Sequence, residues 1–237
     1  MNCKVILAAA ALLATQSFAI VGFGGHYAPG FGTKMKAGEK TSVMKDADFE
    51  RDGFSGTMQG FGFKLWIDIL PIFDIEATYN IQYNKYDASL YVNGSDKPIN
   101  LKFDPAGTPL TKSSPKFIQT TMDLSLTYPI TFIPIIRPYV GGGFTYHANT
   151  FVLNEDYVEN IAKETTADKL GQRIQDETSK ESLKSSAGGH VLVGTRAKLP
   201  LIPIAAYCNF KYYFGGDYPK EIDAGNMTLE VGGGFAL

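Results

Sequence analysis

Eight segments of the chain alternate apolar side chains with small or polar ones at every second residue. A period of two belongs to β-strands, whose successive side chains point to opposite faces, and it does not fit an amphipathic helix. In FIQTTMDLSLTYPI, for example, Met122, Leu124 and Leu126 share one side, whereas Asp123 and Ser125 share the other. The eight segments are Ile20–Phe31, Thr57–Ile69, Asp74–Tyr86, Phe117–Ile130, Arg137–His147, Gly188–Leu199, Ile204–Gly215 and Asn226–Leu237. The pattern therefore predicts an all-β protein with eight two-faced strands.

The connections between these segments alternate in length and in chemistry. Three are very short and apolar, and they contain the sequences ILPIFDI, ITFIPIIRP and KLPLIPIAA. The other four are longer and polar, and they cover Gly32–Gly56, Asp87–Lys116, Ala148–Ala187 and Gly216–Gly225. Because the long loops follow the first, third, fifth and seventh strands, they all lie at one end of the sheet and the tight turns at the other. This order predicts an up-and-down antiparallel meander, which eight strands can close into a barrel without a free edge.

The third long loop, 148–187, contains many helix-forming residues and charges of alternating sign. A helix here would have only a thin apolar stripe, made by Val158, Ile161, Ala162 and Leu170. Because so thin a stripe buries little apolar surface, we expect a solvated, partly ordered loop rather than packed helices.

All full charges in the middle of the strands lie on the face that also carries Gly, Ser, Thr and Asn. A water-facing barrel surface would carry more Lys and Glu along its whole length. A crowded interior would instead hold small residues and a few ions that neutralise one another, because a buried ion without a partner costs several kcal/mol. The set consists of Lys64, Asp68, Glu76, Asp123, Arg196, Lys198, Lys211 and Glu230. We therefore predict that this face lines the lumen and that these eight side chains form an ion network there.

The opposite face has the composition that a lipid bilayer requires. Its aliphatic and aromatic residues include Phe61, Phe63, Leu65, Ile67, Ile69, Ile75, Tyr79, Ile81, Tyr83, Val140, Phe144, Tyr146, Phe210, Tyr212 and Phe214. Aromatic residues gather near the long-loop end at Tyr27, Tyr83, Tyr146, Tyr212 and Phe214, and near the short-turn end at Tyr128 and Phe235. Two aromatic girdles with aliphatic residues between them are typical of transmembrane barrels, since amphipathic rings prefer the headgroup level. A soluble barrel with an oily interior would show the same alternation, with the two faces exchanged.

The first 19 residues have the layout of a secretory signal peptide. Lys4 precedes a ten-residue apolar run, and Ser17-Phe18-Ala19 places small residues at the −3 and −1 positions of a cleavage site. The run is too short to span a bilayer as a helix, so we expect residues 1–19 to be cleaved and residues 20–237 to form the barrel domain. Removal of Lys4 would leave 21 Lys and Arg against 24 Asp and Glu, a balance that argues against a nucleic-acid partner.

The architecture over Ile20–Leu237 resembles the small outer-membrane barrels of Gram-negative-type bacteria, such as the transmembrane domain of outer-membrane protein A and the opacity-like adhesins. The resemblance implies periplasmic short turns, extracellular long loops, contact with outer-membrane lipids, and delivery by periplasmic chaperones and the barrel-insertion machinery. In this family the last strand ends in an aromatic residue that the machinery reads. The matching apolar positions here are Met227, Leu229, Val231, Phe235 and Leu237. This chain departs from the pattern in ending on Leu, with its aromatic residue two places earlier.

The expected ion network has two interpretations. It can fill and neutralise a lumen that is only wide enough for side chains, or it can gate a path for small ions. The width of an eight-stranded barrel favours the first. His26, His147 and His190 also lie on the lumen face, where we expect ordinary hydrogen bonding rather than a metal site. No cofactor is expected.

No nucleophile stands at a recognisable spacing from these histidines in YHANTF or GGHVLVG, so we do not expect an enzyme. The sequence favours a monomeric outer-membrane protein with a structural, surface-display or adhesion role, and surface ligands would meet loops 32–56 and 148–187. A narrow passive channel is the alternative, and a lipid-modifying enzyme is the second alternative.

Overall fold

The computed structural model describes residues 21–68, 72–102, 115–130, 135–150, 152–178, 184–198 and 202–236. The expected signal peptide, together with Ile69 and Leu237, lies outside these residues.

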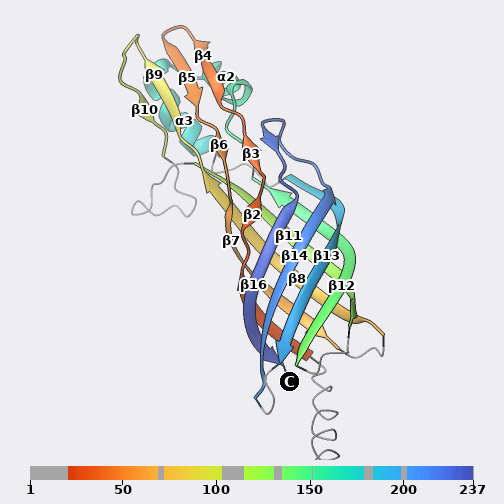
Figure 1. Ribbon diagram of the computed structural model, residues 1–237. Coiled ribbons are helices and arrows are strands. Elements are labelled where there is room, and N and C mark those ends of the chain that lie inside the picture. Colours follow the sequence, from red (N-terminus) through yellow and green to blue (C-terminus); the bar gives the residue numbers. More distant parts are fainter. Residues whose placement is uncertain are drawn as a thin grey trace, which may run out of the picture.

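Eight long strands form a closed antiparallel barrel (Figure 1). In order around the wall they are β1 (Val21–Tyr27), β7 (Gln59–Ile67), β8 (Asp74–Lys85), β11 (Lys116–Pro129), β12 (Ile136–Asn149), β13 (Lys184–Lys198), β14 (Ile204–Gly215) and β16 (Met227–Ala236). Each strand pairs with its neighbour in the chain, and β16 pairs with β1 to close the wall. The predicted fold class is confirmed, and each observed strand lies within a few residues of its predicted segment.

The first and last strands meet along their length, from Gly22 opposite Ala236 to Tyr27 opposite Val231. The closing seam carries many glycines, and Gly22 shows why. A Cβ at this position would lie 2.0 Å from the indole ring of Trp66, which occupies the lumen beside it. The missing side chain is therefore what allows the large ring to fit inside a narrow barrel.

The two faces of the wall differ as the alternation predicts. On β7, Phe63 is 64% exposed, whereas Lys64 beside it is 1% exposed. On β11, Leu124 is 57% exposed, whereas Asp123 is 4% exposed. The apolar side chains point away from the barrel, and the charged side chains point into its lumen.

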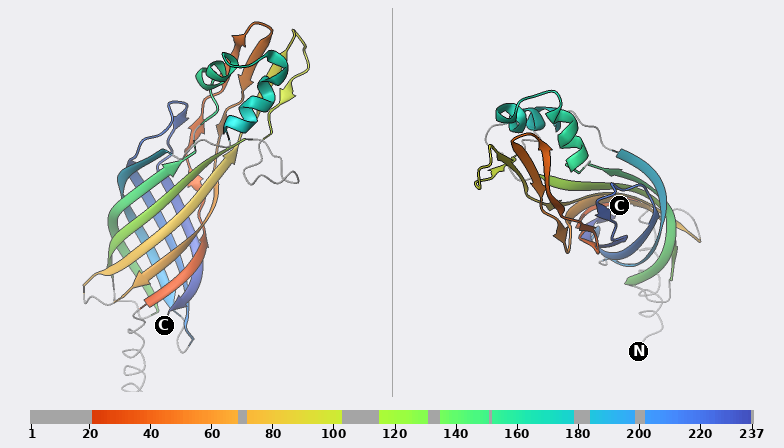
Figure 2. Two further views of the ribbon diagram at one scale, coloured as in Figure 1. Left: turned by 180° about the vertical axis from the view of Figure 1, so that it is seen from behind. Right: turned by 90° about the horizontal axis from the view of Figure 1, so that it is seen from above.

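The long loops do not remain irregular. Three of them fold together into a four-stranded sheet with strand order β10-β9-β5-β4, accompanied by two helices, and we call this unit the head. Its elements are β4 (Gly38–Met44), β5 (Ala47–Arg51), β9 (Ala88–Val92), β10 (Ile99–Asn100), α2 (Glu155–Ala162) and α3 (Ala167–Thr178). The head stands beyond the long-loop end and is displaced to one side of the barrel axis (Figure 2).

Short strands connect the head to the barrel. A three-stranded sheet joins β3 (Lys34–Met35), β6 (Phe54–Ser55) and β15 (Ile222–Asp223), and β2 (Gly30–Phe31) extends the barrel sheet beside β16. The first and fourth long loops are therefore tied together where they leave the barrel wall.

The expectation of a solvated third loop was wrong. The predicted stripe residues Val158, Ile161, Ala162 and Leu170 are buried. They pack in one hydrophobic cluster with Val152, Leu153 and Ile174 of the same loop. The other members come from the other loops and from the strand ends that adjoin the head: Met35, Val43, Ala47, Phe49, Met58, Tyr86, Ala88, Leu90, Leu101, Phe117 and Ile222. A stripe too thin to order a helix by itself suffices here because the three other long loops and the adjoining strand ends supply the rest of the core.

Helix α2 begins with a regular cap. The side chain of Asn154 accepts a hydrogen bond from the Tyr157 backbone N–H at 3.0 Å, and Glu155 and Asp156 occupy the first turn, where the helix dipole favours acids. Among the described residues, no helix is long and apolar enough to cross a membrane.

Candidate functional site

The interior of the barrel contains all eight charged residues that the sequence analysis assigned to it. Each lies within 4.0 Å of an ion-pair partner of opposite sign. Two further charges, Asp74 and Arg137, join them near the short-turn rim. The described lumen and its rim thus hold five bases and five acids, so the network is electrically neutral.

The group nearest the short turns is organised by one guanidinium. Arg196 on β13 donates to Asp68 at 2.7 Å and to Glu76 on β8, so it links two carboxylates. Lys198 donates to the other oxygen of Asp68 at 2.7 Å, and Lys64 lies 2.6 Å from Glu76. Arg196 and Lys64 are buried, and a buried cation is retained without a large desolvation penalty only when it is paired in this way.

A second group lies further toward the long loops and is organised by one ammonium. Lys211 on β14 lies 2.7 Å from both Asp123 and Glu230. Asp123 also accepts hydrogen bonds from Thr145 and Tyr213. The oxygens of both carboxylates are therefore occupied, as a fully buried ion cluster requires.

Neutral polar side chains join the two groups. Lys64 donates to the Tyr139 hydroxyl at 3.0 Å, and Tyr139 donates to the Asn209 side-chain oxygen. The amide nitrogens of Asn209 and Asn80 each donate to Glu230 at 2.9 Å. These contacts form one connected network along the lumen from Asp68 to Asp123. Seven strands contribute residues to it.

Sequence reasoning missed several members of this network. Asp74 and Arg137 lie at strand ends, and only charges in the middle of strands were considered. Asn80 lies on the same strand face as Glu76, and Asn209 lies on the same face as Lys211. The alternation that placed the charges in the lumen could therefore also have placed these two amides there. Large rings were not expected inside, yet Trp66, Tyr139, Tyr207 and Tyr213 are all buried in the lumen.

The three histidines lie inside the barrel but do not converge. His26 contacts Asn80 at 2.6 Å and Tyr207 at 3.0 Å, which connects β1 to the network. His190 contacts Ser125 and Thr145, each at 2.8 Å, whereas His147 lies beneath Tyr218. Within the described residues, no group of three or more potential metal ligands is found.

The contact between Ser125 and His190 resembles a nucleophile and its base. His190 reaches Thr145 through its other ring nitrogen, and Thr145 donates to Asp123 at 2.9 Å. Ser125 and His190 are each about 1% exposed, and both lie on barrel strands within the filled lumen. An acyl-transfer site needs room for the reacting carbonyl about 3 Å from the nucleophile, and packed side chains surround this serine. The geometry fits a structural hydrogen bond.

The fourth long loop covers the long-loop end of the lumen. The Tyr218 hydroxyl accepts a hydrogen bond from Gln119 at 3.1 Å and lies 3.5 Å from His147. Burial raises the pKa of Tyr218 to about 12, so the phenol stays protonated near neutral pH. Burial also raises the pKa of Tyr86, whose hydroxyl accepts the Leu153 backbone N–H in the head.

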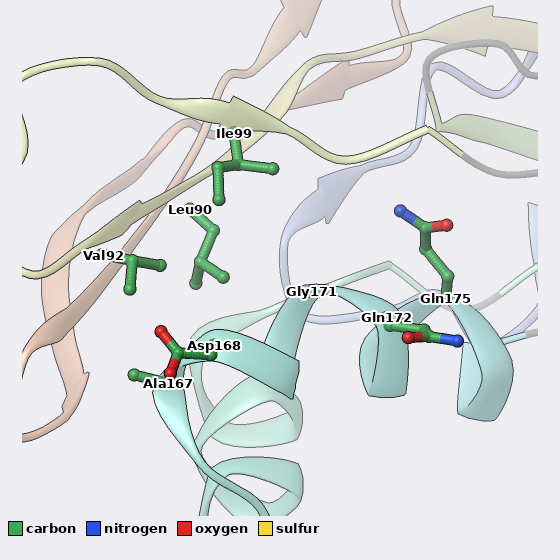
Figure 3. A pocket seen from close by; sticks show the side chains of 8 residues that line it. All are labelled: Leu90, Val92, Ile99, Ala167, Asp168, Gly171, Gln172 and Gln175. Carbon is green, nitrogen blue, oxygen red and sulfur yellow. The ribbon is translucent and has the colours of Figure 1, made fainter.

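The head contains a hollow of about 300 Å³ between α3 and the strands β9 and β10. Leu90, Val92 and Ile99 line it from the strands, and Ala167, Asp168, Gly171, Gln172 and Gln175 line it from the helix (Figure 3). This volume is at the small end of the range for ligand sites, about 300–1,000 Å³. Its lining combines aliphatic side chains, two amides and the carboxylate of Asp168.

The outer wall completes the description. Exposed apolar residues surround the barrel, with Tyr27, Tyr146, Tyr212 and Phe214 toward the head and Tyr128 and Phe235 toward the short turns. On the last strand, Met227, Val231 and Phe235 are exposed on this wall, whereas Glu230 is buried inside. An apolar outside and a neutralised polar inside define a membrane-spanning β-barrel of the small, eight-stranded outer-membrane type.

Comparisons with known proteins find the same architecture at low similarity. No protein-family model matches this sequence, and no curated protein matches it. Among solved structures, the chain is similar to the outer membrane protein OprG from Pseudomonas aeruginosa, with 11% identity and a TM-score of 0.48 over 91% of this chain and 94% of that one. It is also similar to Ail, the attachment invasion locus protein of Yersinia pestis, crystallised with the heparin analogue sucrose octasulfate. Here the identity is 8% and the TM-score 0.45, over 91% of this chain and 96% of that one. A third similar structure is that of Neisserial surface protein A, with 12% identity and a TM-score of 0.45 over 92% of this chain and 97% of that one. At these values the likenesses carry no argument about function.

A charge placed on the outer wall tests the orientation of the barrel. Leu124→Arg is expected to lower the free energy of unfolding in phospholipid bilayers by about 2–4 kcal/mol, the cost of Arg near the bilayer midplane. Thr41→Arg, on exposed strand β4 of the head, is the matched control and should change it by about 0.5 kcal/mol or less. Equal effects of the two substitutions would mean that this wall does not face hydrocarbon.

Proposed function

We propose that this chain is a monomeric outer-membrane protein that presents a folded head at the cell surface, with a structural or adhesive role. In this proposal residues 1–19 are removed after export, the insertion machinery reads the last strand, and lipids surround the apolar wall. The observation that carries the display role is the hydrophobic cluster shared by the long loops. Loops that only connect strands have no need of a common core, whereas a surface that binds a partner benefits from being held rigid.

The filled lumen supports display over the channel alternative. The network of contacts from Asp68 to Asp123 is continuous, and the buried rings of Trp66 and Tyr213 fill further space in the lumen. An eight-stranded barrel is only wide enough for its own side chains. Ion passage would require several buried pairs to separate together, so in this proposal the ion network is a structural filling.

The first experiment tests placement. A short epitope inserted between Lys45 and Asp46, at the turn joining β4 and β5, should bind antibody on intact cells. The protein should fractionate with the outer membrane and migrate differently on gels before and after heating. An epitope that is detected only after permeabilisation, or a single unshifted band in the soluble fraction, would contradict the proposal.

A second experiment separates display from conduction. Purified protein in planar bilayers should give no steady current, because the lumen is occluded. Steady conductance that disappears when Lys211 or Glu230 is neutralised would instead favour a channel. The lipid-modifying alternative would appear as a change in lipid A mass between cells with and without the protein.

A further inference from the structure

Two lysines stand directly opposite each other on the outer wall. Lys85, the last residue of β8, is the register partner of Lys116, the first residue of β11. Directly opposed residues on an antiparallel pair have Cβ atoms about 4.5–5.5 Å apart and point to the same face. Like charges on directly opposed residues are destabilising, so the pair weakens this part of the sheet unless an anion is bound between the two side chains.

Their position on the outside of the barrel follows from a neighbouring ring. Tyr83, two residues before Lys85, belongs to the outward aromatic girdle, and the Lys116 ammonium lies 6.0 Å from the centre of its ring. Lys85 is exposed and Lys116 is half-buried. Both lysines therefore face the surroundings of the barrel.

The described part of the chain supplies no counter-ion to either lysine. Among the described residues, no ion pair within 4.0 Å includes Lys85 or Lys116, whereas every charge in the lumen is paired. Unpaired basic residues are ordinary on a soluble surface. They are unusual as directly opposed partners in a sheet, where like charges are normally avoided.

Their level relative to the membrane indicates which anion fits. On this wall the polar tips of Tyr27 and Gln59 are hydrogen-bonded to each other, and Gln59 is the register partner of Tyr83. Such tips mark the boundary at which hydrocarbon ends. Lys85 lies two residues beyond Tyr83, about 7 Å along the strand, which is the level of lipid phosphates.

We infer that Lys85 and Lys116 clamp the phosphate of an anionic lipid in the outer leaflet. This inference rests on the proposed membrane insertion, and it adds a lipid site on the wall formed by β8 and β11. One phosphate between the two ammonium groups replaces their repulsion with two charge-assisted hydrogen bonds. The apolar residues below, Ile81 and Ile118, would contact the acyl chains.

The test uses the full mature chain in phosphatidylcholine nanodiscs that contain a small fraction of phosphatidic acid, with native mass spectrometry to count retained lipids. At about 1 kcal/mol for each basic residue near an anionic surface, Lys85→Gln combined with Lys116→Gln should weaken retention of phosphatidic acid about 30-fold. The control, Lys45→Gln with Lys97→Gln, removes the same charge from turns at the tip of the head and should retain phosphatidic acid like the unaltered protein.

Two further measurements separate the possible outcomes. Inorganic phosphate added to nanodiscs without phosphatidic acid should not be retained, and retention equal to that of the lipid would overturn the assignment to a lipid. Equal retention of phosphatidic acid by the double variant and the control would overturn the clamp. A gel mobility that changes on heating for all variants shows that insertion is intact, so failure of the clamp is distinguishable from failure of the proposed function.

Discussion

Lys211→Met is expected to lower the free energy of unfolding of the barrel by about 3–5 kcal/mol. The methionine has a similar length, so the loss is electrostatic rather than a loss of packing. Asp123 and Glu230 would remain buried without the ammonium that lies 2.7 Å from both. A buried carboxylate without its partner cation retains the desolvation penalty and loses the compensating attraction. Trp66, the only tryptophan and a lumen residue, gives the fluorescence signal for a urea titration in micelles or bilayers.

The control for this substitution lies at the short-turn rim. Lys198→Met removes another cation from the network, but its side chain is partly exposed and Asp68 keeps its bond to Arg196 at 2.7 Å. We expect a loss of about 1 kcal/mol or less. Adding Asp123→Asn and Glu230→Gln to Lys211→Met should recover most of the loss, because no buried charge then lacks a partner. A Lys211→Met barrel as stable as the unaltered one would show that these charges are not desolvated.

The barrel and its polarity were predictable because both depend on a local signal. Side-chain direction repeats every two residues, so Asp123 and Leu124 reveal opposite environments without knowledge of the fold. The parity of each charge was sufficient to place Lys64, Glu76 and Lys211 inside. Parity does not reveal which strands face each other across a lumen, so the pairing of Lys64 with Glu76, or of Lys211 with both Asp123 and Glu230, was not predictable.

The head was not predictable because its signal is distributed. Phe49, Leu90 and Leu170 come from three different long loops, and each loop contains too few apolar residues to form a core by itself. Only the closure of the barrel brings the loop ends together, and this reduces the entropy that a free chain would lose on bringing them into contact. The thin stripe of 148–187 led to the wrong expectation of a solvated loop, because partners such as Phe49 and Leu90 lie in other loops, far away in the sequence.

Phe49→Ala is expected to unfold the head while the barrel remains folded. Phe49 lies on β5, is fully buried in the hydrophobic cluster, and would leave a cavity that costs about 3–5 kcal/mol. A small unit has a total stability of about 5–15 kcal/mol at most, so this loss removes a large share of it. Amide hydrogen exchange should show loss of protection in β4, β5, β9, α2 and α3, with β11 to β14 unchanged and the heat-dependent gel shift retained.

The matched control is Asp48, the residue that precedes Phe49 on the same strand. Asp48→Ala alters the opposite face of the head sheet, where the carboxylate makes only an exposed pair with Lys40 at 3.7 Å, so protection should change little. If Phe49→Ala leaves exchange in α2 and α3 as slow as in the unaltered protein, the loops do not share a core, and the rigid display surface loses its basis. If exchange rises in the barrel strands as well, the head and the barrel unfold as one cooperative unit, and the head is then part of what stabilises the barrel in the membrane.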